Sequence, residues 1–178
     1  MSKVYFISDL HFGHRRITEF VPGARSGRNC TENMQNIINN WNAVVKKRDF
    51  VWVLGDIAMS KEGFDALGEL AGTKYMVKGN HDNRFTTEEW LRHFKSVESL
   101  VSYKGYWLSH CPIHPAELRG KKNIHGHVHT QSIVAPVDYN EERFWDRNYI
   151  NICCEAINET PVSFDDIKGG AYWERKRY

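Results

Sequence analysis

Short apolar runs recur along the chain, and each of them stops at glycine, aspartate, asparagine or histidine. The runs are rich in β-branched and aromatic side chains, which at this length favours strands. Five strands are predicted, at residues 3–8, 49–54, 74–78, 105–109 and 122–124. The polar residues that follow these runs are therefore expected at the ends of strands.

A helical periodicity replaces this pattern between residues 31 and 47. The apolar positions share one helical face, and they are Met34, Ile37, Ile38, Trp41, Val44 and Val45. Thr31 is predicted to cap the start of this helix. Shorter helices are predicted at residues 61–70 and 87–94. Because strands alternate with helices, the sequence predicts an α/β fold with at least partly parallel strand pairing.

Two stretches, residues 12–29 and 131–148, carry no clear periodicity. Both are longer than ordinary connections, so they are interpreted as functional loops. Residues 149–167 predict a strand, a turn near Pro161 and a second short strand.

Composition bounds the class of protein. The 178 residues fit a single domain over residues 1–178 with a sizeable core. Twenty-four basic against 22 acidic residues leave a net charge of +2, which does not mark the whole protein as a nucleic-acid or membrane binder. The apolar run at the N-terminus is too short for a signal peptide or membrane span, so a cytoplasmic location is expected. The four cysteines form no C-x-x-C pair and are interpreted as reduced thiols.

The residues at the strand ends carry the candidate chemistry. They are Asp9, His11, Asp56, Asn80, His81, His110, His127 and His129. In open α/β sheets the carboxyl ends of the strands form the ligand-binding edge, so these side chains are expected to converge. Each motif alone has a structural explanation, such as a turn or a core histidine, but the ordered set favours a site.

Spacing adds geometry to this set. Asp9 and His11 are two residues apart and project to the same side of an extended strand end, as do His127 and His129. Asp56 is a single carboxylate whose two oxygens can bridge two cations. The residues thus favour a two-metal centre, although spacing alone does not separate His125 from the two histidines that follow it.

The motifs resemble a known family. "DLH", "GD", "GNHD", "SH" and "GHVH" are similar to the signature of the calcineurin-like metallophosphoesterases, over residues 9 to 129. The resemblance implies a single-domain α-β-β-α sandwich of four layers with a dinuclear metal site on one edge. It implies a first metal held by Asp9, His11, Asp56 and His129. It implies a second metal held by Asp56, Asn80, His110 and His127.

The resemblance also implies the chemistry. Two divalent transition-metal ions would activate a hydroxide that attacks a phosphoester, with manganese expected first and iron, zinc, cobalt or nickel as alternatives. Asp56 and Asn80 act as ligands at the reacting centre, and His81 assists the leaving group. His125 is expected to support the ligands or face the substrate. The expected substrate is a small phosphodiester or phosphomonoester, and no membrane partner is expected.

One departure from the superfamily narrows this expectation. Its protein phosphatases carry G-D-x-x-D-R-G, whereas this chain has "GDIAMS" with Met59 in place of the second aspartate. Protein phosphatase activity is therefore disfavoured. The residue that orients His81 is left unassigned, and Asp82 is a candidate only through its proximity.

Substrate contacts are predicted at three residues near the first motif. His14 follows the metal-bearing turn, while Arg25 and Arg28 lie in the long loop and could clamp a phosphate; an exposed, solvated loop is the competing interpretation. Two other functions stay open. A nuclease with a DNA or RNA partner is the first, disfavoured by the short chain, and a catalytically silent scaffold is the second. The sequence does not define the oligomeric state.

Overall fold

The computed structural model of the protein describes residues 1–133 and 146–174. Its strands form two sheets, ordered β4-β3-β2-β1-β9 and β5-β6-β7-β8. The first sheet contains β1 (Val4–Ile7), β2 (Phe50–Val53), β3 (Thr73–Val77), β4 (Val97–Glu98) and β9 (Val162–Ser163). The second contains β5 (Leu100–Tyr103), β6 (Tyr106–Ser109), β7 (Lys122–His125) and β8 (Tyr149–Asn151). Pairing is parallel except where β9 meets β1 and where β5 meets β6.

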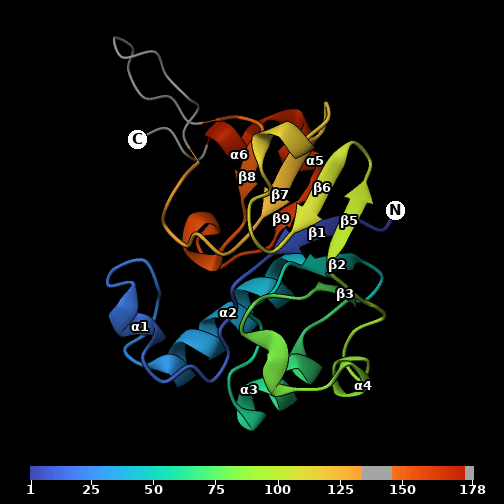
Figure 1. Ribbon diagram of the computed structural model, residues 1–178. Coiled ribbons are helices and arrows are strands. Elements are labelled where there is room, and N and C mark those ends of the chain that lie inside the picture. The colour runs from blue at the N-terminus through green and yellow to red at the C-terminus, as the bar shows by residue number, and fades with distance from the viewer. Residues whose placement is uncertain (134–145, 175–178) are drawn as a thin grey trace.

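Helices cover the outer sides of the two sheets, which gives the four-layer α/β sandwich (Figure 1). The helices on the side of the first sheet are α1 (Ile17–Phe20), α2 (Cys30–Val44), α3 (Lys61–Asp65) and α4 (Thr87–Trp90). Those on the side of the second sheet are α5 (Phe164–Gly169) and α6 (Ala171–Glu174). Short 3-10 helices are η1 (Ala66–Glu69), η2 (Asp82–Arg84), η3 (Pro115–Glu117) and η4 (Cys154–Ile157). The expected fold class and layer arrangement are confirmed.

The long helix α2 illustrates how the sequence sets an element. Its apolar face is buried, and Trp41, which is 0% exposed, also donates its indole N–H to the carbonyl of Ala71 at 2.9 Å. The predicted N-cap, Thr31, is wrong: the side chain of Asn29 accepts the N–H groups of Thr31 and Glu32. Asn29 sits in extended backbone one residue before the helix, which is the geometry that an N-cap needs.

One hydrophobic core joins the two sheets. It contains Phe6 and Val53 from the first sheet and Leu108 and Ile124 from the second, all 0% exposed. A core shared in this way fixes the two sheets against each other. The strand ends of both sheets can therefore contribute to one site.

All five predicted strands are present, and the two further strands predicted in residues 149–167 are confirmed as β8 and β9, which lie in different sheets. The structure adds α1 within the predicted loop 12–29, and it adds β4, β5, α5 and α6. Of the second predicted loop, residues 134–145 lie outside the described residues. Throughout residues 1–133 and 146–174, no helix is long and apolar enough to cross a membrane. The four cysteines are free thiols.

Candidate metal centre

Five strand-end loops meet at one edge of the molecule. The loops after β1 and β2 are joined directly, because the N–H groups of Asp9 and His11 donate to the carbonyls of Gly55 and Asp56, each at 3.0 Å. The N–H of His127, after β7, donates to Oδ2 of Asp9 at 2.9 Å. Backbone contacts thus bring together residues that lie more than 100 positions apart in the sequence.

The backbone at this edge is unusual. Five non-glycine residues have positive φ angles there, and they are Asp9 (58°), His11 (50°), Asp56 (52°), His127 (73°) and His129 (50°). This conformation costs a non-glycine residue about 1–3 kcal/mol and persists only where the surroundings impose it. Such a concentration is typical of functional sites. Each positive φ turns a candidate ligand away from the direction that a continuing strand would give it.

Two glycines allow the loops to approach this closely. A Cβ atom at Gly126 would collide with the Ser8 hydroxyl and the Asp9 carboxylate, and one at Gly79 would collide with Asp56. At Gly126 the lack of a side chain is required by the close approach of the backbone to Asp9.

The candidate ligand atoms form two overlapping groups. Asp9, His11 and His129 form one, and Asp9, Asp56 and His110 form the other, each with ligand atoms within 4.8 Å of one another. Nε2 of His110 lies 3.4 Å from Oδ2 of Asp56. Nε2 of His11 lies 3.7 Å from Oδ1 of Asp9 and 3.9 Å from Oδ2 of Asp56. Adjacent groups that share a carboxylate fit a pair of cations.

The remaining predicted ligands adjoin the second group. Oδ1 of Asn80 lies 2.9 Å from Nε2 of His110, and Nδ1 of His127 lies 3.2 Å from the same nitrogen. Cys111 was not predicted for the site, yet its thiol completes a third group with His110 and His127. Burial raises the pKa of this thiol above its ordinary value, with help from the two nearby aspartates.

Polar atoms without partners test whether a cation would fit. Oδ1 of Asp9 and both ring nitrogens of His11 are buried and accept or donate no hydrogen bond among the described residues. Burying a polar atom without a partner is costly, and such atoms in native proteins call for an explanation. The mixed oxygen and nitrogen donor set is the one that divalent transition metals bind, so the residues present fit a metal.

Charges in the site support the carboxylates as anions. Burial acts to raise the pKa of Asp9 and Asp56, but both pKa values lie below the ordinary one. The imidazoles of His11 and His110 outweigh burial at Asp9, and the imidazole of His110 with the backbone N–H of His81 outweighs it at Asp56. Burial acts to lower the pKa of His110, yet Asp56 and Asp9 raise it to about 9. In the metal-free protein, the proton on His110 thus balances part of the carboxylate charge.

His81 stands at the open side of this cluster. Its side chain is 59% exposed, and Nε2 lies 4.0 Å from Oδ2 of Asp56. Asp82 was the nearest candidate to orient this ring, but its buried carboxylate accepts the backbone N–H groups of Asp56, Ile57 and Gly79 at 2.8–2.9 Å. Asp82 therefore joins the β2 and β3 loops instead of holding the His81 ring.

A pocket opens beside the cluster. Its residues come from the loops after β1, β3 and β7 and from α1 with the residue that follows it. They are His11, His14, Ile17, Phe20, Val21, His81, His127, Val128, His129, Thr130 and Gln131. His14 is the one predicted substrate contact among them. Its ring lies edge-on to that of His11, with the two ring centroids 5.7 Å apart.

The two predicted arginines lie elsewhere. The side chain of Arg25 is 0% exposed and paired with Glu155, so it does not reach the pocket as a phosphate clamp would. Arg28 is 89% exposed and paired with Glu32 on α2, and it does not line the pocket either. The loop position alone could not distinguish an inward arginine from an outward one.

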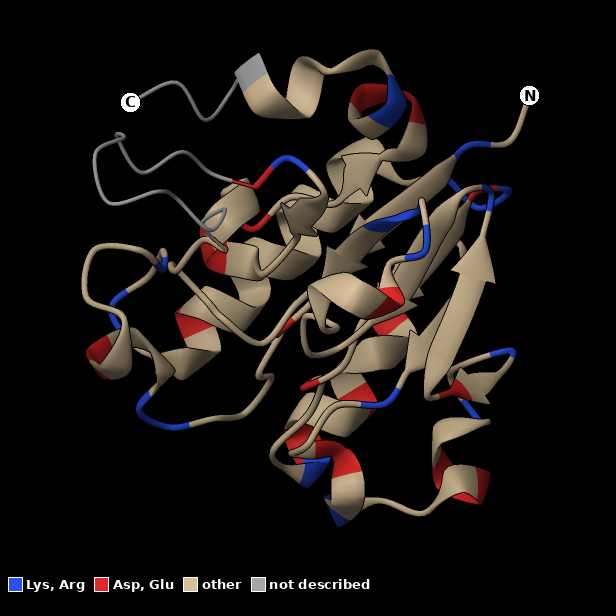
Figure 2. Cartoon of the chain, turned by 45° about the horizontal axis from the view of Figure 1, so that its top comes forward, with Lys and Arg blue, Asp and Glu red and all other residues tan. Residues whose placement is uncertain are grey.

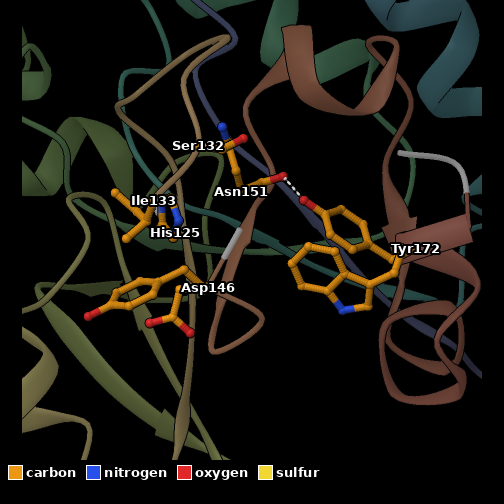
Figure 3. A pocket seen from close by; sticks show the side chains of 8 residues that line it. His125, Ser132, Ile133, Asp146, Asn151 and Tyr172 are labelled. Atoms are coloured by element: carbon orange, nitrogen blue, oxygen red, sulfur yellow. Dashed lines mark hydrogen bonds between the residues drawn. The ribbon is translucent and has the colours of Figure 1, made fainter. Parts of the chain in front are cut away.

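His125 faces a different cavity from the two histidines that follow it. Figure 3 shows it beside Ser132, Ile133 and Asp146, with the hydroxyl of Tyr172 donating to the carbonyl of Asn151 at 2.6 Å across the cavity. His125 belongs to none of the candidate ligand groups. The structure separates it from His127 and His129, which sequence spacing did not.

Glu155 is a part of the site that the sequence did not reveal. From η4 it accepts a hydrogen bond from Nδ1 of His129 at 2.9 Å. This hydrogen bond raises the pKa of His129 and outweighs burial, which acts to lower it. No spacing pattern connects Glu155 to the histidine motif, because 26 residues separate them.

This fold and this edge of histidines and carboxylates define a metallophosphoesterase-type protein. Residues 2–150 match the family model described as calcineurin-like phosphoesterase, and the chain belongs to that family. The resemblance seen in the motifs is confirmed.

The relatives are similar over most of their length. The uncharacterized protein MJ1445 of Methanocaldococcus jannaschii is 33% identical over 174 residues, which covers 94% of this chain and 90% of that protein. The gene 66 protein of Mycobacterium phage L5 is 30% identical, covering 76% of this chain and 81% of its own length. A solved structure, the protein of unknown function AQ665 from Aquifex aeolicus, has a TM-score of 0.71 at 26% identity and covers 95% of this chain and 99% of that one.

Proposed function

We propose that this chain is a hydrolase that cleaves a small phosphodiester or phosphomonoester at a centre of two divalent cations. The observation that carries the proposal is that Oδ2 of Asp56 lies between two adjacent ligand groups, 3.9 Å from Nε2 of His11 and 3.4 Å from Nε2 of His110. The unpartnered buried atoms of Asp9 and His11 add to it. The assigned ligands of one cation are Asp9, His11, Asp56 and His129. Those of the other are Asp56, Asn80, His110 and His127.

When bound, such a pair of cations supplies an activated water and offsets charge on the phosphoryl oxygens. Manganese is the first ion to test, followed by iron, zinc, cobalt and nickel. Asp56, whose pKa is held low, remains an anion at neutral pH and faces both ligand groups. Asn80 offers a neutral oxygen donor, which limits the negative charge that the substrate meets.

His81 is assigned to the leaving group. Its exposed ring lines the pocket, and no candidate ligand group includes it. An imidazole in that place can hold a proton at Nε2 and donate it to the departing oxygen. The backbone N–H of His81 donates to Oδ1 of Asp56 at 2.9 Å. This bond holds the backbone of His81 beside a candidate ligand.

The pocket favours a small substrate with one phosphoryl group. Ile17, Phe20 and Val21 form an apolar wall of the pocket, where the ring of Phe20 packs against that of His14. No lysine or arginine lines the pocket among the described residues, and the guanidinium of Arg16 lies 4.9 Å from the centroid of the Phe20 ring. Basic and acidic residues are interspersed over the described chain (Figure 2), whereas nucleic-acid binding favours a continuous basic surface.

The test is a screen of metals against substrates. Chelated protein is reloaded with each of the five metals and assayed on p-nitrophenyl phosphate, bis-p-nitrophenyl phosphate, cyclic nucleotides, dinucleotides and nucleoside phosphates, with Asp56→Asn as the matched blank. We expect hydrolysis by the wild type and about a thousandfold less by the variant. Equal rates for both proteins on every ester would reject the proposal. A salt-dependent gel shift together with cleavage of DNA or RNA would replace it with a nuclease.

A further inference from the structure

Glu155 and Arg25 form a buried ion pair directly beneath the candidate centre. Oε1 of Glu155 accepts a hydrogen bond from Nε of Arg25 at 2.8 Å, and both side chains are 0% exposed. Because removing two charges from water offsets most of their attraction, a buried ion pair is weak evidence for stability. Its contacts with the centre are more informative.

Arg25 braces the first ligand turn. Its guanidinium donates to the carbonyls of Asp9 and Leu10, which belong to the turn between β1 and His11. Asp9 and His11 both have positive φ angles in this turn. Because Arg25 is a charged donor to two consecutive carbonyls, it stabilises this turn, whose positive φ angles are unfavourable for Asp9 and His11 on their own.

Glu155 fixes the third ligand. The same Oε1 accepts the hydrogen bond from Nδ1 of His129 at 2.9 Å. A carboxylate that binds one ring nitrogen holds the proton there, which leaves the lone pair of Nε2 for a cation and fixes the orientation of the ring. The imidazole of His129 also stacks on that of His11, with the two ring centroids 5.3 Å apart.

We infer that Glu155 and Arg25 are positioning residues for one of the two cations, the one assigned to the group of Asp9, His11 and His129. The inference rests on the two-cation centre of the proposed function. The ion pair has hydrogen bonds to Asp9, Leu10 and His129, and the ring of His129 stacks on that of His11. It has no hydrogen bond to Asn80, His110 or His127 among the described residues. Loss of Glu155 therefore affects one cation more than the other.

Glu159 provides a matched control. It is 3% exposed, lies four residues further along the chain and also holds the loop of residues 12–29. Its carboxylate accepts the N–H and hydroxyl of Ser26 and the side-chain amide of Asn33. Removing Glu159 frees Ser26 and Asn33, and it removes none of the hydrogen bonds by which Arg25 holds the Asp9 turn and Glu155 holds His129. Asn33 also accepts a hydrogen bond from Nη1 of Arg25, at 3.5 Å.

The first experiment counts bound metal. Wild type, Glu155→Ala and Glu159→Ala are stripped with chelator and titrated with Mn²⁺ or Zn²⁺, and the metal retained per folded chain is measured together with its affinity. We expect two equivalents in the wild type and in Glu159→Ala. In Glu155→Ala we expect one equivalent at unchanged affinity and a second weakened about 10- to 100-fold. Two equivalents at wild-type affinity in Glu155→Ala would overturn the inference.

The second experiment needs no metal and no variant. Nitrogen-15 NMR of the imidazole of His129 in metal-free wild type, at a pH where the ring is neutral, reports which nitrogen carries the proton. We expect the proton on Nδ1, and a predominant Nε2–H form would overturn the inference even if Glu155→Ala failed to fold.

Glu155→Gln keeps an oxygen acceptor and should hold the second equivalent of metal with an affinity within about tenfold of the wild type. Wild type that binds two metals but hydrolyses no ester would reject the proposed activity and leave this inference standing.

Discussion

The carboxylate of Asp56 contacts His81 twice: Oδ1 accepts the backbone N–H of His81 at 2.9 Å, and Oδ2 lies 4.0 Å from its ring nitrogen Nε2. The first contact does not involve the side chain of His81. The backbone at residue 81 can therefore keep Asp56 in place when the imidazole is removed.

His81→Ala is expected to retain both metals and the wild-type melting temperature while losing about 10²–10⁴-fold in kcat. The ring is mostly exposed, so its removal leaves no cavity. Metal content, thermal melting and hydrolysis of p-nitrophenyl phosphate and bis-p-nitrophenyl phosphate are measured on the same sample. His114→Ala, an exposed histidine outside the pocket, is the control and should keep wild-type metal content and hydrolysis. Undiminished hydrolysis by His81→Ala would reject the assigned role.

Asp82→Asn is expected to destabilise the protein by about 2–4 kcal/mol. Oδ2 of Asp82 accepts two backbone N–H groups and Oδ1 accepts a third, so an amide places its own N–H₂ against donors in a site that is 0% exposed. Urea unfolding measures the change in the free energy of unfolding. Asp65→Asn, whose carboxylate is 59% exposed beside Lys61, should change it by no more than about 0.5 kcal/mol. Similar stabilities for the two variants would contradict this account of Asp82.

The stability of the metal-free protein is expected to fall as the pH rises from 7 to about 10. The folded-state pKa of His110 is about 9, whereas an unperturbed histidine titrates near 6.5. The folded state thus binds an extra proton, and the stabilisation is full below pH 6.5 and lost as the pH passes 9. Urea unfolding in the presence of a chelator measures the slope against pH. His110→Gln should flatten that slope, and identical slopes in the two proteins would show that His110 does not cause it.

Phe20→Ala is expected to lower kcat/KM about 3- to 10-fold for aryl phosphoesters and to leave small alkyl phosphoesters unchanged. The ring of Phe20 is 59% exposed on the apolar wall of the pocket, and an aromatic contact contributes about 0.5–1.5 kcal/mol. The ratio of kcat/KM for phenyl phosphate to that for glycerol phosphate is the measurement. Leu91→Ala removes another exposed apolar side chain, 49% exposed, outside the pocket. Equal losses on both substrates would show that Phe20 does not select the ester group.

The positions of five strands could be predicted, because apolar runs followed by polar residues reflect burial and strand length directly. The convergence of Asp9 and Asp56 followed from the rule that parallel strands share one ligand-binding edge. His110 follows a strand of the second sheet and reaches them only because the two sheets pack together. The short edge strands β4 and β5 were missed, since β4 has only two residues and β5 is half-exposed. Strands of this kind leave little periodicity.

The residues that support the site were harder to predict than those that line it. Glu155 and Arg25 meet across 130 positions, and nothing in the local sequence of either residue records that contact. The capping of α2 by Asn29 in place of Thr31 has a similar origin, because both side chains suit an N-cap and only the course of the preceding loop decides. Side-chain direction in irregular segments depends on tertiary packing, which a single sequence does not display.

The candidate centre takes its residues from both sheets: Asp9 and Asp56 follow strands of the first, and His110 and His129 follow strands of the second. Each assigned cation takes ligands from both sheets, so either ion would act as a cross-link between the two β layers. Amide hydrogens in β2 and β7, which never pair with each other, would then exchange more slowly together when the ion binds, because opening either sheet would first require its release.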